Sequence, residues 1–175
     1  MEARFVESNV YGFSECIKDR FDIAFTSYGV FCWLPNLTEW AKEAAARIKP
    51  GGRFHLVEFH PIMQTLKRNG DGAVIMAHPY FNDGVIAYEP DGTGSYATPD
   101  NPINETTYEW AHSVGEVITA ISEAGLSVVR LSAFPFTTQG DFVGCLHEYE
   151  QGLWAYPDSE HGIPLTFAVM AEKPG

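Results

Sequence analysis

The sequence predicts an α/β fold, and the pattern of residues 21–60 is the main evidence for it. Residues 21–28 form a nearly continuous apolar run, which is typical of a strand in a parallel sheet. A helical pattern follows over residues 36–48, and a second strand pattern covers residues 53–60. A strand, a helix and a strand in this order make a βαβ unit, whose crossover is right-handed.

The helix of this unit has a recognisable beginning and end. Asn36 can accept a hydrogen bond from the first turn, and Glu39, three residues later, completes a capping-box pattern. The Lys49-Pro-Gly-Gly sequence ends the helix, because proline disfavours helical geometry at the residue before it. One apolar face is predicted from the helical spacing of Leu37, Trp40, Ala41, Ala44 and Ile48.

Further elements are predicted before and after this unit. Residues 4–8 are a strand candidate, and so are residues 107–110, 127–134 and 165–171. A second helix begins at the capping box of Ser113 and Glu116 and stops at Gly125. The apolar face of this helix comprises Val114, Val117, Ile118 and Ile121.

Two long loop regions interrupt these elements within what we expect to be a single domain over residues 1–175. Residues 61–107 contain many prolines, glycines and asparagines, and residues 135–162 are rich in aromatic side chains. Long segments without periodicity are usually functional or disordered. Aromatic residues favour order, so residues 61–107 are predicted to be an inserted cap.

The composition excludes several classes of partner. The chain has 175 residues, with 11 Lys+Arg against 23 Asp+Glu and a formal charge of −12. This acidic balance disfavours binding to nucleic acid or to an anionic membrane. The sequence contains no apolar run long enough for a membrane span and no signal-peptide pattern at Met1–Glu7. Three widely spaced cysteines suit reduced thiols, so a cytoplasmic location is expected.

Several motifs resemble those of class I S-adenosylmethionine-dependent methyltransferases. The resemblance begins with the segment Phe21–Asn36 and the Lys49-Pro-Gly-Gly-Arg-Phe turn, and it continues through Val57–Pro61 and Tyr108–Ser113. It ends with the strand in Pro164–Pro174. The resemblance implies a partial Rossmann-like methyltransferase sheet that begins near the family's third strand and has an antiparallel final strand.

The sequence also departs from this family. Methyltransferases of this class begin with a strand, a glycine-rich cofactor loop and a second strand that ends in an acid, and none of these is found here. In the family's strand order, 3-2-1-4-5-7-6, the strand at residues 21–28 would be left without its neighbour. An exposed strand edge invites pairing. We expect a second copy of the chain, a swapped element or a separate complementing chain to cover it; alternatively, the chain is truncated.

The resemblance implies that this chain supplies half of a site for S-adenosylmethionine. Ser27, Tyr28 and Gly29 follow the strand and would contact the methionine half of the cofactor. Asn9 and Val10 match the position that faces adenine. Tyr28 and Trp33 could offer aromatic faces to the sulfonium group. Alternatively, Trp33 packs in the core.

His60 and Glu58 are the candidates for a catalytic general base. They lie two residues apart and therefore on the same face of an extended strand. The alternative is that they cap the end of the strand before Pro61. His55 lies on the opposite face, which argues against a metal site formed with Glu58 and His60, and no metal is expected.

Residues near the second capping box are the candidates for binding the methyl acceptor. Trp110 and His112 precede the helix, and Tyr80 lies in the cap region. Other aromatic residues either line the pocket or fill the core, and the sequence leaves both readings open for Phe81, Phe142, Trp154 and Tyr156.

The predicted function is methyl transfer from S-adenosylmethionine to a nitrogen, oxygen or carbon atom of a small molecule. Two alternatives stay open: a non-catalytic partner or regulatory half-domain, and an inactive truncated chain. A dehydrogenase is less well supported, because the sequence has no Gly-x-Gly-x-x-Gly motif.

Overall fold

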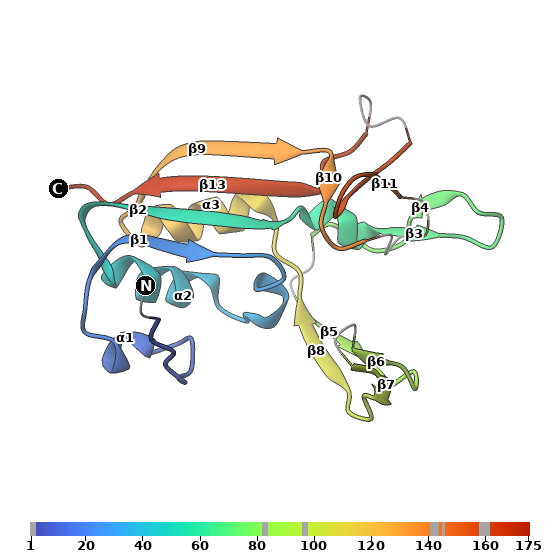
Figure 1. Cartoon of the computed structure of the whole chain (residues 1–175), viewed down its shortest axis with the longest axis horizontal. Helices are drawn as coiled ribbons and strands as arrows, with labels where there is room; N and C mark the ends of the chain where they lie inside the picture. The colour runs from blue at the N-terminus through green and yellow to red at the C-terminus, as the bar shows by residue number, and fades with distance from the viewer. Residues whose placement is uncertain (1–2, 82–83, 96–97, 141–143, 145, 158–161) are drawn as a thin grey trace.

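The centre of the protein is a mixed sheet with the strand order β1-β2-β13-β9 (Figure 1). The computed structural model describes residues 3–81, 84–95, 98–140, 144, 146–157 and 162–175. β1 is parallel to β2, whereas β13 is antiparallel to both β2 and β9. This confirms the predicted antiparallel final strand and the expected position of β1 at the edge. The strands are β1 (Phe21–Thr26), β2 (Ile48–Phe59), β9 (Ser127–Phe134) and β13 (Thr166–Glu172).

Two helices, α2 (Leu37–Ala46) and α3 (Val114–Glu123), pack against one face of this sheet (Figure 1). Ser113 and Glu116 form the complete predicted capping box at α3. The box predicted at α2 is incomplete. Asn36 Oδ1 accepts from the Glu39 N–H at 3.0 Å, but the Asn36 N–H donates to Tyr11 Oη instead. A short helix, α1 (Phe13–Cys16), precedes β1. No described helix is long and apolar enough to cross a membrane.

The end of α2 differs from the prediction by a few residues. The helix stops at Ala46, and Ile48 is the first residue of β2 rather than part of the helix face. The Lys49-Pro-Gly-Gly sequence bulges out of β2. Phe21 pairs with Ile48 and Ile23 pairs with Arg53, so one residue of β1 lies opposite four residues of β2. Gly51 adopts a φ of 75° in this bulge.

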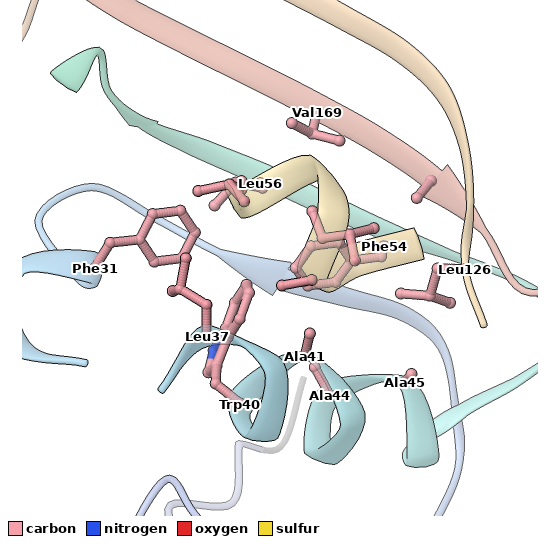
Figure 2. Close-up of a cluster of buried hydrophobic side chains, with 14 of the residues drawn as sticks. Phe31, Leu37, Trp40, Ala41, Ala44, Ala45, Phe54, Leu56, Leu126 and Val169 are labelled. Atoms are coloured by element: carbon pink, nitrogen blue, oxygen red, sulfur yellow. The ribbon is translucent and has the colours of Figure 1, made fainter. Parts of the chain in front are cut away.

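The main core lies between the sheet and the two helices (Figure 2). Trp40 of α2 packs edge-to-face against Phe31 and Phe54, with ring centroids 5.0 and 5.7 Å away. Val117 and Ile121 of α3 are fully buried in the same cluster, as their spacing predicts. Burial of such side chains contributes about 1.5–3 kcal/mol each, so this cluster is the main source of stability.

The opposite face of the sheet is uncovered at β1. Ala24 packs against the core, whereas Ile23 and Phe25 point to the other side and are 61% and 62% exposed. An apolar run of this kind is typical of a strand that is covered on both faces of a parallel sheet, but among the described residues only one face of β1 is covered. Ile23 and Phe25 would become buried if another segment or chain covered this face of β1.

The strand predicted at residues 4–8 is absent. Residues 3–9 belong to no helix or strand, and Phe5 is 93% exposed. In the expected strand order, the family's third strand is separated from β1 by two other strands. Residues 4–8 therefore have no neighbour with which to form backbone hydrogen bonds.

The two loop regions fold into short antiparallel sheets. The first region carries the pairs β3–β4, β5–β8 and β6–β7, and the second carries the three-stranded sheet β10-β12-β11. A 3₁₀ helix, η2 (Pro61–Thr65), joins β2 to the first region. The strands are β3 (Leu66–Arg68), β4 (Val74–Met76), β5 (Val85–Tyr88), β6 (Gly94–Ser95), β7 (Thr98–Pro102), β8 (Thr107–Trp110), β10 (Phe136–Thr137), β11 (His147–Glu150) and β12 (Leu153–Ala155).

Gly52 is the position in the β2 bulge at which a side chain has no room. A Cβ there would lie 2.8 Å from Ile48 Cγ2 and 2.9 Å from the carbonyl oxygens of Asp22 and Lys49. We expect Gly52→Ala to lower the free energy of unfolding by about 1–3 kcal/mol, as overpacking typically does. Urea denaturation would measure this change. Gly70→Ala is the matched control, because a Cβ at Gly70 meets nothing within 4 Å. Equal midpoints for the two variants would contradict this account of the bulge.

Candidate functional site

The carboxyl ends of the parallel strands β1 and β2 meet at one edge of the sheet, where a buried carboxylate organises the chain. Glu58, near the end of β2, is 4% exposed. Its Oε1 accepts from the Gly29 N–H at 2.6 Å and its Oε2 from the Val30 N–H at 2.8 Å. The N–H groups of Phe31 and Phe59 donate to the same carboxylate at 3.3 and 2.7 Å. Both oxygens are therefore occupied by backbone donors.

These hydrogen bonds explain how a carboxylate can be buried in the absence of a cationic partner. A buried charge is costly unless it is hydrogen-bonded, and hydrogen bonds to charged groups are the strong ones. The four donors, three of them consecutive in the loop after β1, compensate the desolvation of Glu58. The carboxylate thereby fixes the path of residues 29–31 into the 3₁₀ helix η1 (Phe31–Trp33).

The loop after β1 presents aromatic side chains to the solvent. Tyr28 stacks on Phe59, with ring centroids 5.4 Å apart, and both lie at the carboxyl ends of their strands. Gly29 adopts a φ of 70°, which favours glycine. Trp33 is 54% exposed, so the reading that places it in the core is wrong. Ser27 is exposed beside Tyr28. These residues form an accessible surface at the position that the resemblance indicates for the cofactor.

His60 lies just beyond the end of β2. Its Nδ1 accepts from the Ile62 N–H at 3.3 Å and so caps η2, and its ring packs edge-to-face on Phe167. Burial lowers the pKa of His60 and so favours the neutral ring. The structure thus contains the predicted cap at the strand end. The role of His60 or Glu58 as a general base stays a prediction.

A pocket of about 240 Å³ lies between η2 and the β5–β8 pair. We call it the β8 pocket. It contains two of the three residues predicted to bind the acceptor, Trp110 and Tyr80. Tyr80 is held in place because its Oη accepts from the Val114 N–H at 3.3 Å. The polar and aromatic residues of the lining are Gln64, His78, Tyr80, Tyr88, Glu109 and Trp110.

The electrostatics of Glu109 connect the β8 pocket to the loop after β1. Burial raises the pKa of the half-buried Glu109 carboxyl. Burial, followed by the charges of Glu109 and Glu58, raises the pKa of the Cys32 thiol in η1 to about 12. Burial also raises the pKa of Tyr88, and Glu109 adds to this shift. The Cys32 thiol is thus influenced by both carboxylates, and the helix η1 that carries it contacts β8.

His112, Asn9 and Val10 lie neither in the β8 pocket nor in the loop after β1. His112 instead donates from Nε2 to the Leu34 carbonyl oxygen at 2.6 Å, and it faces a separate open hollow between the first turns of α2 and α3. Asn9 Oδ1 accepts from the Tyr11 N–H at 2.9 Å in a local turn. Val10 packs against the main core. The proposed contacts of Asn9 and Val10 with adenine stay predictions.

The remaining aromatic candidates separate into different environments. Trp154 and Tyr156 pack in a second hydrophobic cluster around Met63, which supports their reading as core residues. Phe81 is exposed and contacts Tyr80 edge-to-face, with ring centroids 4.9 Å apart. Phe142 lies outside the described residues. Within the described part of the chain, no group of three His, Cys, Asp or Glu side chains could hold a metal ion.

Sequence reasoning missed Glu109 and Tyr88 as pocket residues. Tyr88 lies on β5 and Glu109 on β8, and these strands pair so that Ile86 lies opposite Glu109. The sequence shows Glu109 as an acid between two aromatic residues in a strand pattern. This pattern alone does not show that Glu109 lines a pocket, because the pocket forms only when β8 pairs with residues about twenty positions earlier in the sequence.

Replacing Glu58 tests its role in the loop after β1. Glu58→Gln keeps the size, but its NH₂ group cannot accept the backbone N–H groups that now reach one of the carboxylate oxygens. We expect the free energy of unfolding to fall by about 1–3 kcal/mol, the usual cost of an unsatisfied buried donor. Urea denaturation measures this change. Hydrogen exchange at Gly29 and Val30 should also become faster.

Glu172→Gln is the matched control for this variant, because it removes only the exposed ion pair with Arg53, 3.2 Å apart. Such pairs contribute about 0–1 kcal/mol. A loss of stability in Glu58→Gln no larger than that in Glu172→Gln would contradict the role assigned to Glu58.

Comparison with solved structures identifies the fold. A proposed S-adenosylmethionine-dependent methyltransferase from Listeria monocytogenes is 13% identical, with a TM-score of 0.60, and the match covers 90% of this chain and 63% of that one. A second such methyltransferase, from Clostridium acetobutylicum, is also 13% identical, with a TM-score of 0.57 and coverage of 100% and 66%. No protein-family model and no curated protein sequence gives a match.

The glycopeptide N-methyltransferase MtfA is a third similar structure, solved with S-adenosyl-L-methionine. It is 15% identical, with a TM-score of 0.50, and the match covers 96% of this chain and 59% of that one. This chain therefore spans about 60% of the length of the first structures it matches. At these identities the comparison concerns the fold alone. The chain has part of the fold of S-adenosylmethionine-dependent methyltransferases.

Proposed function

We propose that this chain forms the acceptor side and part of the cofactor side of an S-adenosylmethionine-dependent methyltransferase for small molecules. One observation carries the proposal: the loop after β1, which Glu58 holds in place, leads into η1, and η1 contacts the strand β8 that lines the β8 pocket. In parallel sheets, ligands bind beyond the carboxyl ends of the strands. Both features occupy that edge of the sheet.

The residues at this edge fit one side of the cofactor. Tyr28 and Trp33 offer accessible aromatic faces suited to a sulfonium cation, an interaction worth about 0.5–2 kcal/mol. Glu58 already holds the N–H groups of residues 29–31, so these donors are not available to a ligand. The cofactor, when bound, would supply the methyl group to be transferred. The chain contributes a rigid loop, an aromatic surface and an adjoining pocket.

Methyl transfer to a nucleophile depends mainly on alignment of the reacting atoms and on exclusion of water. In this proposal, Glu58 acts as a positioning residue that keeps the loop after β1 at a fixed distance from the pocket. Trp110 and Tyr80 provide the apolar walls against which an acceptor is oriented. Neither the positioning of the loop nor the orientation of the acceptor requires Glu58 to exchange a proton. Backbone donors already occupy both of its oxygens, which favours a positioning role over that of a general base.

Calorimetric titration with S-adenosylhomocysteine tests the cofactor part of the proposal. We expect saturable micromolar binding by the folded chain, and at least a tenfold weaker affinity in Trp33→Ala, which removes an exposed aromatic face. Phe81→Ala is the matched control, since Phe81 is also exposed but lies in the cap region. Folded protein that shows no binding in any oligomeric state would rule out a cofactor site in this chain. Equal affinities of the two variants would remove Trp33 from the site.

The uncovered side of β1 favours a second role, as a structural partner in an assembly. β1 has a free edge, and Ile23 and Phe25 are exposed beside it. When the chain is alone in solution, a second copy can supply a strand for this edge. Such a contact would be isologous, with β1 antiparallel to its symmetry mate.

We therefore expect the isolated chain to form a dimer through β1. Phe25→Asp should weaken the dimer at least tenfold, because it places a charge in the centre of the apolar surface. Sedimentation or light scattering would measure the mass over a concentration series. Met76→Asp is the control, since Met76 is equally exposed on β4, away from the sheet edge. A monomeric wild-type chain, or equal dissociation of both variants, would contradict pairing through β1.

A further inference from the structure

We propose that the β8 pocket binds a primary or secondary ammonium group carried on a compact aromatic scaffold. The inference deepens the function proposed above, because it names the class of acceptor as an amine. It rests on that function only where it treats the bound amine as a methyl acceptor. The binding itself is argued from the pocket alone.

The first argument is the state of the Glu109 carboxylate. Glu109 lines the pocket and is half-buried. Within the described part of the chain, its side chain has no ion pair and no hydrogen bond. This is the opposite of Glu58, whose oxygens receive four backbone donors. A half-buried carboxylate without a partner in the protein favours a cationic ligand, which would form an ion pair with it.

The second argument is the charge of the other lining residues. Among the residues that the structure describes, no lysine or arginine lines the pocket, and His78 is the single basic side chain there. The chain as a whole carries a formal charge of −12. An anionic ligand would therefore meet a carboxylate and an unfavourable overall field, whereas a cation would be attracted.

The third argument is the aromatic lining. Tyr80, Tyr88 and Trp110 line the same pocket as Glu109. Aromatic faces attract ammonium groups and also pack against flat apolar scaffolds. The hydrogen bond that Tyr80 accepts from Val114 holds its ring in position. In an arylalkyl amine, the aromatic ring would pack against these side chains and the ammonium group would lie near Glu109.

The size of the pocket limits the ligand. Its volume of about 240 Å³ exceeds the roughly 150 Å³ cavity that accepts benzene, and it falls below the roughly 300 Å³ at which pockets for drug-sized ligands begin. A single aromatic ring with a short amine-bearing chain fits these bounds. A peptide or a polycyclic compound would exceed them.

The chemistry of transfer would follow from this placement. The ammonium loses one proton to the Glu109 carboxylate, and that proton passes on to water. The nitrogen lone pair of the free amine then forms the N–CH₃ bond. The S–CH₃ bond of a sulfonium donor breaks at the same time, and its electron pair stays on sulfur, which becomes a thioether.

The test uses the full chain and the probe 2-phenylethylamine, which is an ammonium ion at pH 7. Its neutral isostere, 2-phenylethanol, is the control ligand, because it differs only in carrying a hydroxyl group in place of the ammonium group. Chemical-shift titration by NMR measures both affinities without any cofactor. We expect the ammonium probe to bind at least tenfold more tightly than the alcohol, with shifts at Glu109 and Trp110.

Two variants separate a specific site from general attraction to an acidic protein. Glu109→Gln keeps the shape of the side chain but removes its charge, and it should weaken ammonium binding at least tenfold while leaving alcohol binding unchanged. Glu105→Gln removes the same charge from an exposed position before β8 and should have no effect. Equal affinity for both probes in the wild-type protein would overturn the inference. Equal weakening in both variants would do so as well.

The outcome is independent of the cofactor experiment. Ammonium binding without S-adenosylhomocysteine binding would support the ligand class and reject the proposed methyl transfer. Binding of S-adenosylhomocysteine alone would support the cofactor surface and reject the amine. The comparison of the two probes in wild-type protein requires no variant, so it holds even if Glu109→Gln fails to fold.

Discussion

The arrangement of the candidate site depends on the buried Glu58 carboxylate. The sheet fixes Glu58 at the carboxyl end of β2, and the backbone donors of residues 29–31 fix the following loop against it. Through this loop, the carboxylate sets the position of η1, where Cys32 lies near Glu109. Because η1 contacts β8, the β8 pocket adjoins the loop that Glu58 holds. A shift at Glu58 would propagate to both proposed ligand surfaces.

The sequence predicted the sheet and helices well, because their signals are local. The capping box at Ser113, the stop at Gly125 and the buried positions Val117 and Ile121 all follow from spacing within one element. The strand at residues 4–8 was predicted wrongly, because strand formation depends on a non-local partner. A strand requires a partner, and a short apolar stretch says nothing about whether one is present.

The site was harder to predict because it is formed by pairs that are distant in the sequence. Trp110 and Tyr80, both predicted to bind the acceptor, line one pocket, and their role in binding stays a prediction. His112 was predicted to bind the acceptor, but the sequence could not show its hydrogen bond to Leu34, which lies 78 residues earlier. The spacing of Glu58 and His60 suggested a catalytic pair. It could not reveal that backbone donors already occupy the Glu58 oxygens, since the partners lie almost thirty residues earlier.

The carboxylates of Glu58 and Glu109 lie at the same edge of the sheet but differ in their surroundings. Glu58 is more deeply buried, yet its charge is compensated by fixed dipoles, so it stabilises the loop. Glu109 is half-buried and receives no such donors from the described residues, so its oxygens are left to solvent or to a ligand. Because Tyr80, Tyr88 and Trp110 line the same pocket, the proposed ammonium ligand would both pack against aromatic rings and supply the positive charge that Glu109 lacks.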